Sequence, residues 1–221
     1  MLSLDHVRKV YLRGTQEVLA LHDITLDVAR GEFVSIMGPS GSGKSTLLNL
    51  IGCLDSPTSG TVSIDGADVG RLDDEALTAV RRRKVTVIFQ FYNLLPTLSA
   101  LENVALPRLL DGQSEASSRR RASELLDTVG LGHRREHLPE ELSGGEMQRV
   151  AIARALMSEA PLLLADDPTG NLDTVTAVSV MDLLTRTIRD VGLTLVLVTH
   201  DPAVAALADR TIHIRDGRLV P

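Results

Sequence analysis

The residues with the clearest chemical meaning form a glycine-rich stretch at positions 38–45, which reads GPSGSGKS. This stretch fits the pattern G-x-x-x-x-G-K-[ST] at every fixed position. Glycines let such a loop turn tightly, so that its backbone N–H groups face a phosphate with no Cβ in the way. The Lys44 ammonium can reach the β- and γ-phosphates, and the Ser45 hydroxyl can bind Mg²⁺. The stretch therefore predicts a site for a nucleoside triphosphate.

The same stretch lies between a predicted strand at residues 32–37 and a predicted helix at residues 44–53. The first turn of that helix would add unpaired N–H groups and a positive dipole end. The predicted phosphate-binding residues are Gly38, Ser40, Gly41, Ser42, Gly43, Lys44, Ser45 and Thr46. The alternative is a Gly/Ser-rich turn that matches by chance, but the strand-loop-helix context favours the phosphate site.

An acidic residue at the end of an apolar run predicts where the metal would bind. Residues 162–166 read LLLAD, which is typical of a buried strand that ends at Asp166. A carboxylate at such a point is a poorly paired charge near a core, which costs free energy. A bound Mg²⁺ would offset this cost. The alternative is an ordinary helix-capping aspartate. Together with the glycine-rich stretch, the pattern predicts a domain that binds Mg²⁺ and a nucleotide.

A second glycine-rich segment, LSGGE at residues 142–146, precedes a helical stretch at residues 147–156. It would place another helix N-terminus where an anion can bind. The alternative is a simple helix start capped by Ser143. Because one chain would then carry two phosphate-binding ends, the pattern suggests that they share a nucleotide.

The LSGGE segment resembles the signature of the ATP-binding cassette (ABC) family, and the motifs of the whole chain follow the order of that family. The resemblance implies ATP and Mg²⁺ as ligands and ATP hydrolysis as the reaction. It implies nucleotide contacts from the signature: Ser143, Gly144, Gly145 and Glu146. The implied metal ligands are Ser45, Gln90 and Asp166.

The resemblance also assigns roles to residues that would mean little alone. Tyr11 lies where the family stacks an aromatic ring on adenine, and Asp173 is the acid of a loop that communicates across a dimer. Gln90 matches a glutamine that touches Mg²⁺, and His200 matches a catalytic histidine that contacts the γ-phosphate. Without the motifs, Tyr11 would be interpreted as packing and His200 as polar surface.

One position departs from the family pattern. The family has glutamate directly after the strand-end aspartate, where it polarises the attacking water, but this chain has Asp167. The shorter side chain would hold its carboxylate about 1 Å farther back, and a misplacement of that order costs about 10²-fold in rate. One hypothesis is slow hydrolysis with a long-lived ATP-bound dimer. The alternative is that backbone adjustment or a bridging water restores the reach.

The spacing of apolar residues predicts an α/β fold. Alternation at period two predicts antiparallel strands at residues 2–7 and 24–29. Near-continuous apolar runs at residues 162–165, 193–198 and 211–214 predict parallel strands buried on both faces. The resemblance implies a P-loop NTPase core with a mostly parallel sheet, an N-terminal antiparallel β subdomain and an inserted α-helical subdomain.

The length of 221 residues fits one large domain with an inserted lobe. The chain is therefore predicted to be a single ABC ATPase domain over residues 1–221. Residues 1–90 and 158–221 would form the catalytic core with the β subdomain. Residues from about 91 to 157 would form the helical subdomain that carries the signature.

Composition narrows the range of partners. The net charge of −6 argues against a nucleic-acid partner. The single cysteine, Cys53, favours a reducing compartment, and no apolar run approaches the roughly 20 residues of a membrane span. Basic runs at residues 81–84 and 119–121 are interpreted as solvated helix faces. For the first run, contact with a permease or the membrane surface stays open.

The resemblance implies a homodimer in the ATP-bound state, in which the glycine-rich loop of one copy and Ser143 and Gly145 of the other enclose each ATP. Closing and reopening this dimer would drive an integral membrane permease at the cytoplasmic face of the inner (plasma) membrane. Residues 50–60 and 165–173 resemble the MacB/LolD branch, which serves export, lipoprotein release or mechanotransmission. Two alternatives are a soluble ABC ATPase acting on DNA or ribosomes and an ATP-dependent regulatory clamp.

Overall fold

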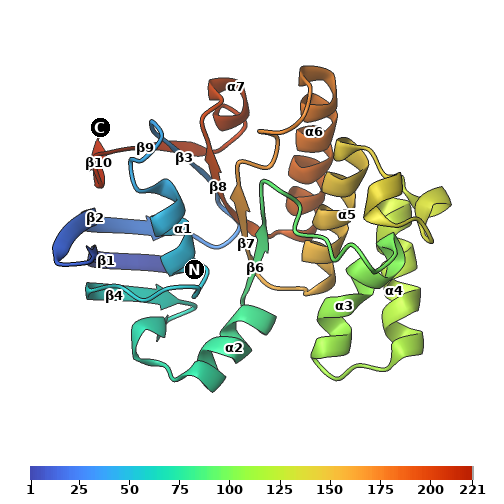
Figure 1. The fold of residues 1–221 in the computed structure, drawn as a ribbon, viewed down its shortest axis with the longest axis horizontal. Helices are drawn as coiled ribbons and strands as arrows, with labels where there is room; N and C mark the ends of the chain where they lie inside the picture. The colour runs from blue at the N-terminus through green and yellow to red at the C-terminus, as the bar shows by residue number, and fades with distance from the viewer. Residues whose placement is uncertain (221) are drawn as a thin grey trace.

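The computed structural model describes residues 1–220, which form two β-sheets flanked by helices (Figure 1). The smaller sheet is antiparallel, with the order β2-β1-β4-β5. Its strands are β1 (Leu2–Arg13), β2 (Gln16–Val28), β4 (Ser59–Ile64) and β5 (Ala67–Asp68). The period-two alternation predicted at residues 24–29 is present, since Ile24, Leu26 and Val28 are buried and the residues between them are exposed.

The larger sheet has six strands in the order β10-β9-β3-β8-β7-β6. These are β3 (Phe33–Met37), β6 (Val85–Ile88), β7 (Leu162–Asp166), β8 (Thr194–Thr199), β9 (Arg210–Arg215) and β10 (Arg218–Val220). All neighbours are parallel except β10, which pairs antiparallel with β9. The order places β3 between β9 and β8, so segments far apart in the chain lie side by side.

Helices cover both faces of the larger sheet (Figure 1). They are α1 (Lys44–Ile51), α2 (Asp74–Arg83), α3 (Ala100–Leu110), α4 (Glu115–Thr128), α5 (Gly144–Met157), α6 (Thr174–Val191) and α7 (Pro202–Ala205). Short 3₁₀ turns lie at Val69–Arg71, Gly132–Arg134 and Pro139–Glu141. Within residues 1–220, no helix is both long and apolar enough to cross a membrane.

Strand β7 shows why the apolar runs of the sequence are continuous. Leu163 and Ala165 pack into the core that contains α3 to α6, whereas Leu162 and Leu164 pack into the core that contains α1 and the antiparallel sheet. A strand buried on both faces has no solvent side for polar residues, as expected for a parallel sheet between two layers. The predicted α/β class, with an antiparallel N-terminal sheet and a mostly parallel sheet, is confirmed.

Helix α2 and strand β10 are among the elements that the sequence analysis did not predict. Helix α2 has no fully buried residue and contacts the core only through the half-buried Leu77 and Val80. It is marked by the Asp73 N-cap and a basic last turn. Strand β10 is only three residues long and follows a tight turn at Asp216 and Gly217, both with positive φ. The division into core and helical subdomain stays a prediction, because residues of α3 to α5 share one apolar core with β7 and β8.

The two-sided burial of β7 gives a test of the core. We expect Leu164→Ala to lower the free energy of unfolding by about 2–5 kcal/mol, because it leaves a cavity at a fully buried position. Leu12→Ala removes the same atoms at a residue that is 74% exposed and should change stability by less than about 0.5 kcal/mol. Urea unfolding followed by circular dichroism measures both, and equal losses would contradict the layered core.

Candidate active site

The parallel strands bring the predicted site residues to one edge of the sheet. Strands β3, β8, β7 and β6 are parallel neighbours, so their carboxyl ends meet there. Gly38, His200 and Asp167 directly follow the ends of β3, β8 and β7, and Gln90 lies two residues beyond the end of β6. The topology therefore brings together residues as far apart in the sequence as Gly38 and His200, in the crevice where α/β sheets place their ligands.

The glycine-rich loop has a backbone that only glycine adopts without strain. Gly43 has φ of 105° and forms the N-cap of α1 with no side-chain cap. A Cβ on Gly43 would lie 2.7 Å from the Ala20 carbonyl oxygen, and one on Gly38 would collide with the Ile214 carbonyl oxygen. Close backbone packing therefore requires glycine at both positions, and it leaves the first-turn N–H groups of α1 without a side-chain cap, as at an anion site.

Lys44 and Ser42 complete the loop. The Lys44 ammonium donates hydrogen bonds to the carbonyl oxygens of Gly38 at 2.7 Å and Pro39 at 2.8 Å. Burial lowers the pKa of Lys44, while the nearby charges of Asp166 and Asp167 act in the opposite direction. The Ser42 hydroxyl is buried and makes no hydrogen bond within the described chain. A polyphosphate in this loop would supply the acceptor that Ser42 lacks, so the residues present fit the ligand.

Asp166, at the end of β7, is held in an environment unfavourable to its charge. Burial raises the pKa of this carboxyl, the Asp167 carboxylate raises it further, and Lys44 partly compensates. A divalent cation at this point would reverse the balance and favour the ionised form. The described chain holds no cluster of three or more His, Cys, Asp and Glu side chains able to bind a metal. The donor set fits a Mg²⁺ that takes one carboxylate, one hydroxyl and phosphate oxygens.

Asp167 is held in a strained backbone conformation and directed at His200. Its φ is 43°, and its backbone N–H donates to the Val198 carbonyl oxygen at 2.8 Å. Its Oδ2 lies 2.9 Å from Nδ1 of His200, and the Thr199 hydroxyl donates to its Oδ1 at 3.3 Å. The carboxylate is mostly buried, whereas the His200 ring is largely exposed. Positive φ at a non-glycine residue is costly and often marks functional sites.

Gly170 lets Gln90 approach Asp167. A Cβ at position 170 would lie 2.5 Å from Oδ2 of Asp167 and 2.9 Å from Nε2 of Gln90, so any larger residue would separate these side chains. The Asn171 amide donates to the Gln90 carbonyl oxygen at 3.0 Å and ties the two loops together. The structure thus brings Gln90, Asp167 and His200 to one place.

The signature segment has the geometry of a capped helix. Ser143 and Glu146 form a reciprocal capping box at the start of α5, and Glu146 also pairs with Arg134 at 3.2 Å. The backbone hydrogen bond from Ser143 outweighs burial and lowers the pKa of Glu146. The capping alternative is therefore present in the structure. Gly144 and Gly145 are closely packed, since a Cβ on Gly144 would lie 2.9 Å from the Tyr92 hydroxyl and one on Gly145 would collide with Cγ2 of Thr176.

Two predicted residues lie outside these clusters. Tyr11 is on β1, 37% exposed, and its hydroxyl donates to Oδ2 of Asp55 at 2.8 Å. Asp173 forms the N-cap of α6 and accepts hydrogen bonds from the N–H groups of Val175 and Thr176. A hydrogen bond with the Thr176 side chain, together with these backbone bonds, lowers the pKa of Asp173, which is exposed on the surface.

The two helix N-termini lie in different layers of the molecule. Helix α1 belongs to the core shared with the antiparallel sheet, and α5 belongs to the core on the opposite face of the parallel sheet (Figure 1). No side-chain hydrogen bond among residues 1–220 joins Ser143 or Glu146 to the glycine-rich loop. Within one chain the two anion sites therefore do not form a single pocket.

Comparison with known proteins decides the family. A family model described as ABC transporter matches residues 21–170. The chain belongs to this family. It is 50% identical to the lipoprotein-releasing system ATP-binding protein LolD of Bordetella pertussis, over 100% of this chain and 95% of LolD. It is 48% identical to the macrolide export ATP-binding/permease protein MacB of Brucella melitensis, over 100% of this chain but 34% of MacB.

A solved structure extends the likeness to the fold. The post-hydrolysis dimer of the ATP-binding cassette MJ0796, bound to ADP and Pi, superimposes with a TM-score of 0.93 at 47% identity. The alignment covers 100% of this chain and 97% of that one. This ABC protein is therefore a LolD- and MacB-like ATP-binding subunit that hydrolyses ATP.

Several residues of the site were not singled out by sequence reasoning. Gly170 and Asn171 lie within the PTGNLD segment, but their contacts with Gln90 depend on packing between β6 and β7. Thr199 could have been found only from its position directly before His200. Lys9 and Asp55, which contact Tyr11, are separated from each other by 46 residues and gave no signal.

The raised pKa of Asp166 gives a stability test. The folded state holds this proton more tightly than the unfolded chain, so the ionised carboxylate costs stability increasingly as pH rises through the folded-state pKa. We expect Asp166→Asn to raise the Tm of the nucleotide-free protein at pH 7 by about 2–4 °C. The gain should shrink as pH falls toward the ordinary aspartate pKa of about 3.9.

Differential scanning fluorimetry at both pH values measures this effect. Asp190→Asn, on the exposed side of α6, is the matched control and should leave the Tm unchanged. An equal gain for Asp166→Asn at both pH values would rule out the ionised carboxylate as its cause.

Proposed function

We propose that two copies of this ATPase close around ATP and thereby drive an integral membrane permease at the cytoplasmic face of the inner membrane. The observation that carries this proposal is the separation of the two helix N-termini, α1 and α5, onto opposite faces of the sheet. A second copy in head-to-tail orientation would bring Ser143 and Gly145 to the glycine-rich loop of the first. The dimeric state of the similar cassette MJ0796 supports this arrangement.

In each pocket, backbone N–H groups of residues 38–46 and the Lys44 ammonium bind the triphosphate. Ser45, Gln90 and Asp166 would hold Mg²⁺, which neutralises charge on the phosphate oxygens when it is bound. Glu146 contributes by fixing the capping box, so that the α5 N-terminus is presented in one conformation. Asp173 holds the start of α6 in the same way.

Asp167 and His200 carry the hydrolytic step. Asp167 orients a water molecule for attack on the γ-phosphate, and His200 contacts that phosphate. The hydrogen bond that Asp167 Oδ2 accepts from Nδ1 of His200, at 2.9 Å, directs the short carboxylate at the histidine and supports the proposal that hydrolysis is slow. A slow step lengthens the time for which the dimer stays closed.

The same hydrogen bond supports a second function, an ATP-dependent clamp that regulates a membrane complex. A clamp and a transport motor differ in how the permease affects turnover. Strong stimulation of ATP hydrolysis by the co-purified permease supports the motor, and turnover that stays low supports the clamp. Co-purification without any membrane protein would favour a soluble ABC ATPase instead.

A groove of about 350 Å³ between α2, β6, α3 and α5 supports docking of the permease. Its lining combines exposed apolar side chains, such as Leu54 and Leu110, with Arg81 and Arg82 of the first basic run. Arg81 donates to the Cys53 carbonyl oxygen at 3.0 Å, and Arg83 pairs with Asp111 at 3.1 Å. Much of the basic run is therefore held in place, as a docking surface requires.

The role of Lys44 gives the first test. We expect Lys44→Ala to abolish measurable ATP binding and ATP-induced dimerisation, because the ammonium is the main positive side-chain charge of the loop. Lys84→Ala, which removes a lysine paired with Asp65, is the control. Isothermal titration calorimetry and size-exclusion chromatography with light scattering give the readouts. A chain that stays monomeric with saturating Mg·ATP under conditions that block turnover would overturn the proposal.

The role of Asp167 gives the second test. We expect Asp167→Glu to raise kcat for ATP hydrolysis by about ten- to a hundred-fold, since it restores the missing methylene. Asp190→Glu makes the same change on the exposed side of α6 and should have no effect. Steady-state phosphate release measures both. An unchanged rate for Asp167→Glu would show that the aspartate already reaches the water.

A further inference from the structure

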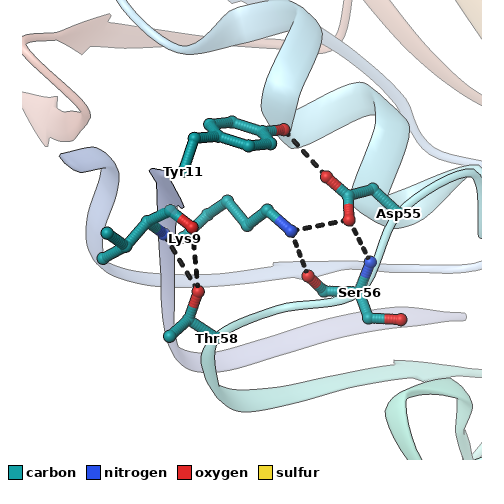
Figure 2. Close-up of polar contacts among 6 residues, drawn as sticks. Lys9, Tyr11, Asp55, Ser56 and Thr58 are labelled. Atoms are coloured by element: carbon teal, nitrogen blue, oxygen red, sulfur yellow. Dashed lines mark hydrogen bonds and ion pairs between the residues drawn. The ribbon is translucent and has the colours of Figure 1, made fainter. Parts of the chain in front are cut away.

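A buried lysine on β1 faces the end of the segment that follows α1. The Lys9 side chain is 11% exposed, and its ammonium bonds to Oδ1 of Asp55 at 2.6 Å and to the Ser56 carbonyl oxygen at 2.8 Å (Figure 2). A lysine is seldom this buried unless its charge is paired. The pair has no contact with the phosphate loop or the carboxylates of the site, so the hydrolytic chemistry leaves it unexplained.

The same carboxylate holds the ring of Tyr11. The Tyr11 hydroxyl donates to Oδ2 of Asp55 at 2.8 Å, and the Lys9 ammonium lies 4.8 Å from the ring centroid. Figure 2 shows the ring lying across the Lys9 side chain with its hydroxyl directed at Asp55. Asp55 therefore divides its two oxygens between a cation beneath the ring and the hydroxyl at the edge of the ring. These contacts fix both the distance of the ring from the Lys9 ammonium and the orientation of the ring.

The charges of this cluster favour the same arrangement. Burial opposes the ionised form of Asp55, but hydrogen bonds from Lys9 and Tyr11 outweigh it and lower the pKa of the carboxyl. Burial raises the pKa of the Tyr11 phenol, Asp55 adds to this, and Thr46 acts in the opposite direction. The Thr46 side chain thus lies near the phenol, which places the edge of the ring beside the first turn of α1.

The hydroxyl of Tyr11 is not needed to hold the neighbouring segment. The Thr58 N–H donates to the Arg8 carbonyl oxygen at 2.8 Å, and the Val10 N–H donates to the Thr58 hydroxyl at 3.0 Å. These bonds already tie residues 56–58 to β1. The contacts between Asp55 and Tyr11 are additional, and what they determine is the position of the ring.

We propose that Lys9 and Asp55 are positioning residues that hold Tyr11 as a preformed stacking platform for the base of the bound nucleotide. The proposal rests on the function proposed above. Lys9 lies against one side of the ring, and a base would stack on the side that faces away from it. Because the ring is held before ATP arrives, little side-chain freedom is lost on binding. The pair therefore increases affinity for the base and leaves the triphosphate contacts unchanged.

The test compares Mg·ATP with inorganic tripolyphosphate, which carries the phosphate chain without a base. Tyr11→Phe keeps the ring and the Lys9–Asp55 pair but removes the hydroxyl that Asp55 holds. We expect its Kd for ATP to rise by about three- to ten-fold, as for the loss of one hydrogen bond. Its Kd for tripolyphosphate should stay within about two-fold of the unmodified protein. In steady-state turnover, KM for ATP should rise while kcat stays unchanged.

Asp55→Asn tests the same link from the other side. Like Tyr11→Phe, it should raise the Kd for ATP and leave the Kd for tripolyphosphate unchanged. The double variant should raise the Kd for ATP by less than the product of the two single fold-changes. Asp65→Asn, which removes an exposed partner of Arg30 and Lys84, is the control and should change neither Kd. If Asp55→Asn fails to fold because Lys9 is left unpaired, Tyr11→Phe decides alone.

Two outcomes would overturn the proposal. Tyr11→Phe could bind ATP as tightly as the unmodified protein, or its Kd values for ATP and for tripolyphosphate could rise by the same factor. Failure of the underlying function gives a different result, because the unmodified protein would then bind neither ligand. Isothermal titration calorimetry with both ligands separates these cases.

Discussion

The N-terminus of α1, held at the carboxyl edge of the parallel sheet, is the feature on which the rest of the structure depends. Its unpaired N–H groups have no side-chain cap, because Gly43 occupies the N-cap position with φ of 105°. An uncapped helix start leaves these donors to water or to an anion, and an anion also gains from the helix dipole. Strand β3 delivers this start to the edge where β7 and β8 end, so the acids and the histidine arrive at the same place.

Several charged groups in and around the site are partly buried, and burial disfavours their ionised forms. Asp166 is half-buried beside Asp167, Lys44 turns back onto loop carbonyls, and Lys9 lies beneath Tyr11. Each group gains from a neighbour of opposite charge or a matching donor, since desolvation alone would disfavour ionisation. The polyphosphate and its cation would supply these partners for Asp166 and Lys44. Binding and order in the site are therefore linked by electrostatics.

The layered core supports the proposal that two copies of this chain work together. One layer carries the glycine-rich loop with α1, and the other carries α5 with the signature, and the parallel sheet separates them. Neither layer can move toward the other without disrupting β-strands buried on both faces. The sheet thus keeps the two helix N-termini apart within the monomer, as the proposed dimer requires.

The amino-acid sequence by itself determined the α/β class, the parallel strands, the glycine-rich loop and the signature segment, because these depend on local pattern and on glycine at set positions. Tertiary structure decided which distant residues meet. It directed Asp167 at His200, opened a space at Gly170 for Gln90, and placed Lys9 and Asp55 around Tyr11. Such contacts depend on strand order and on the packing of loops after the strands. A three-residue strand such as β10, or a helix such as α2 that packs only through the half-buried Leu77 and Val80, likewise gives a weak apolar pattern in the sequence.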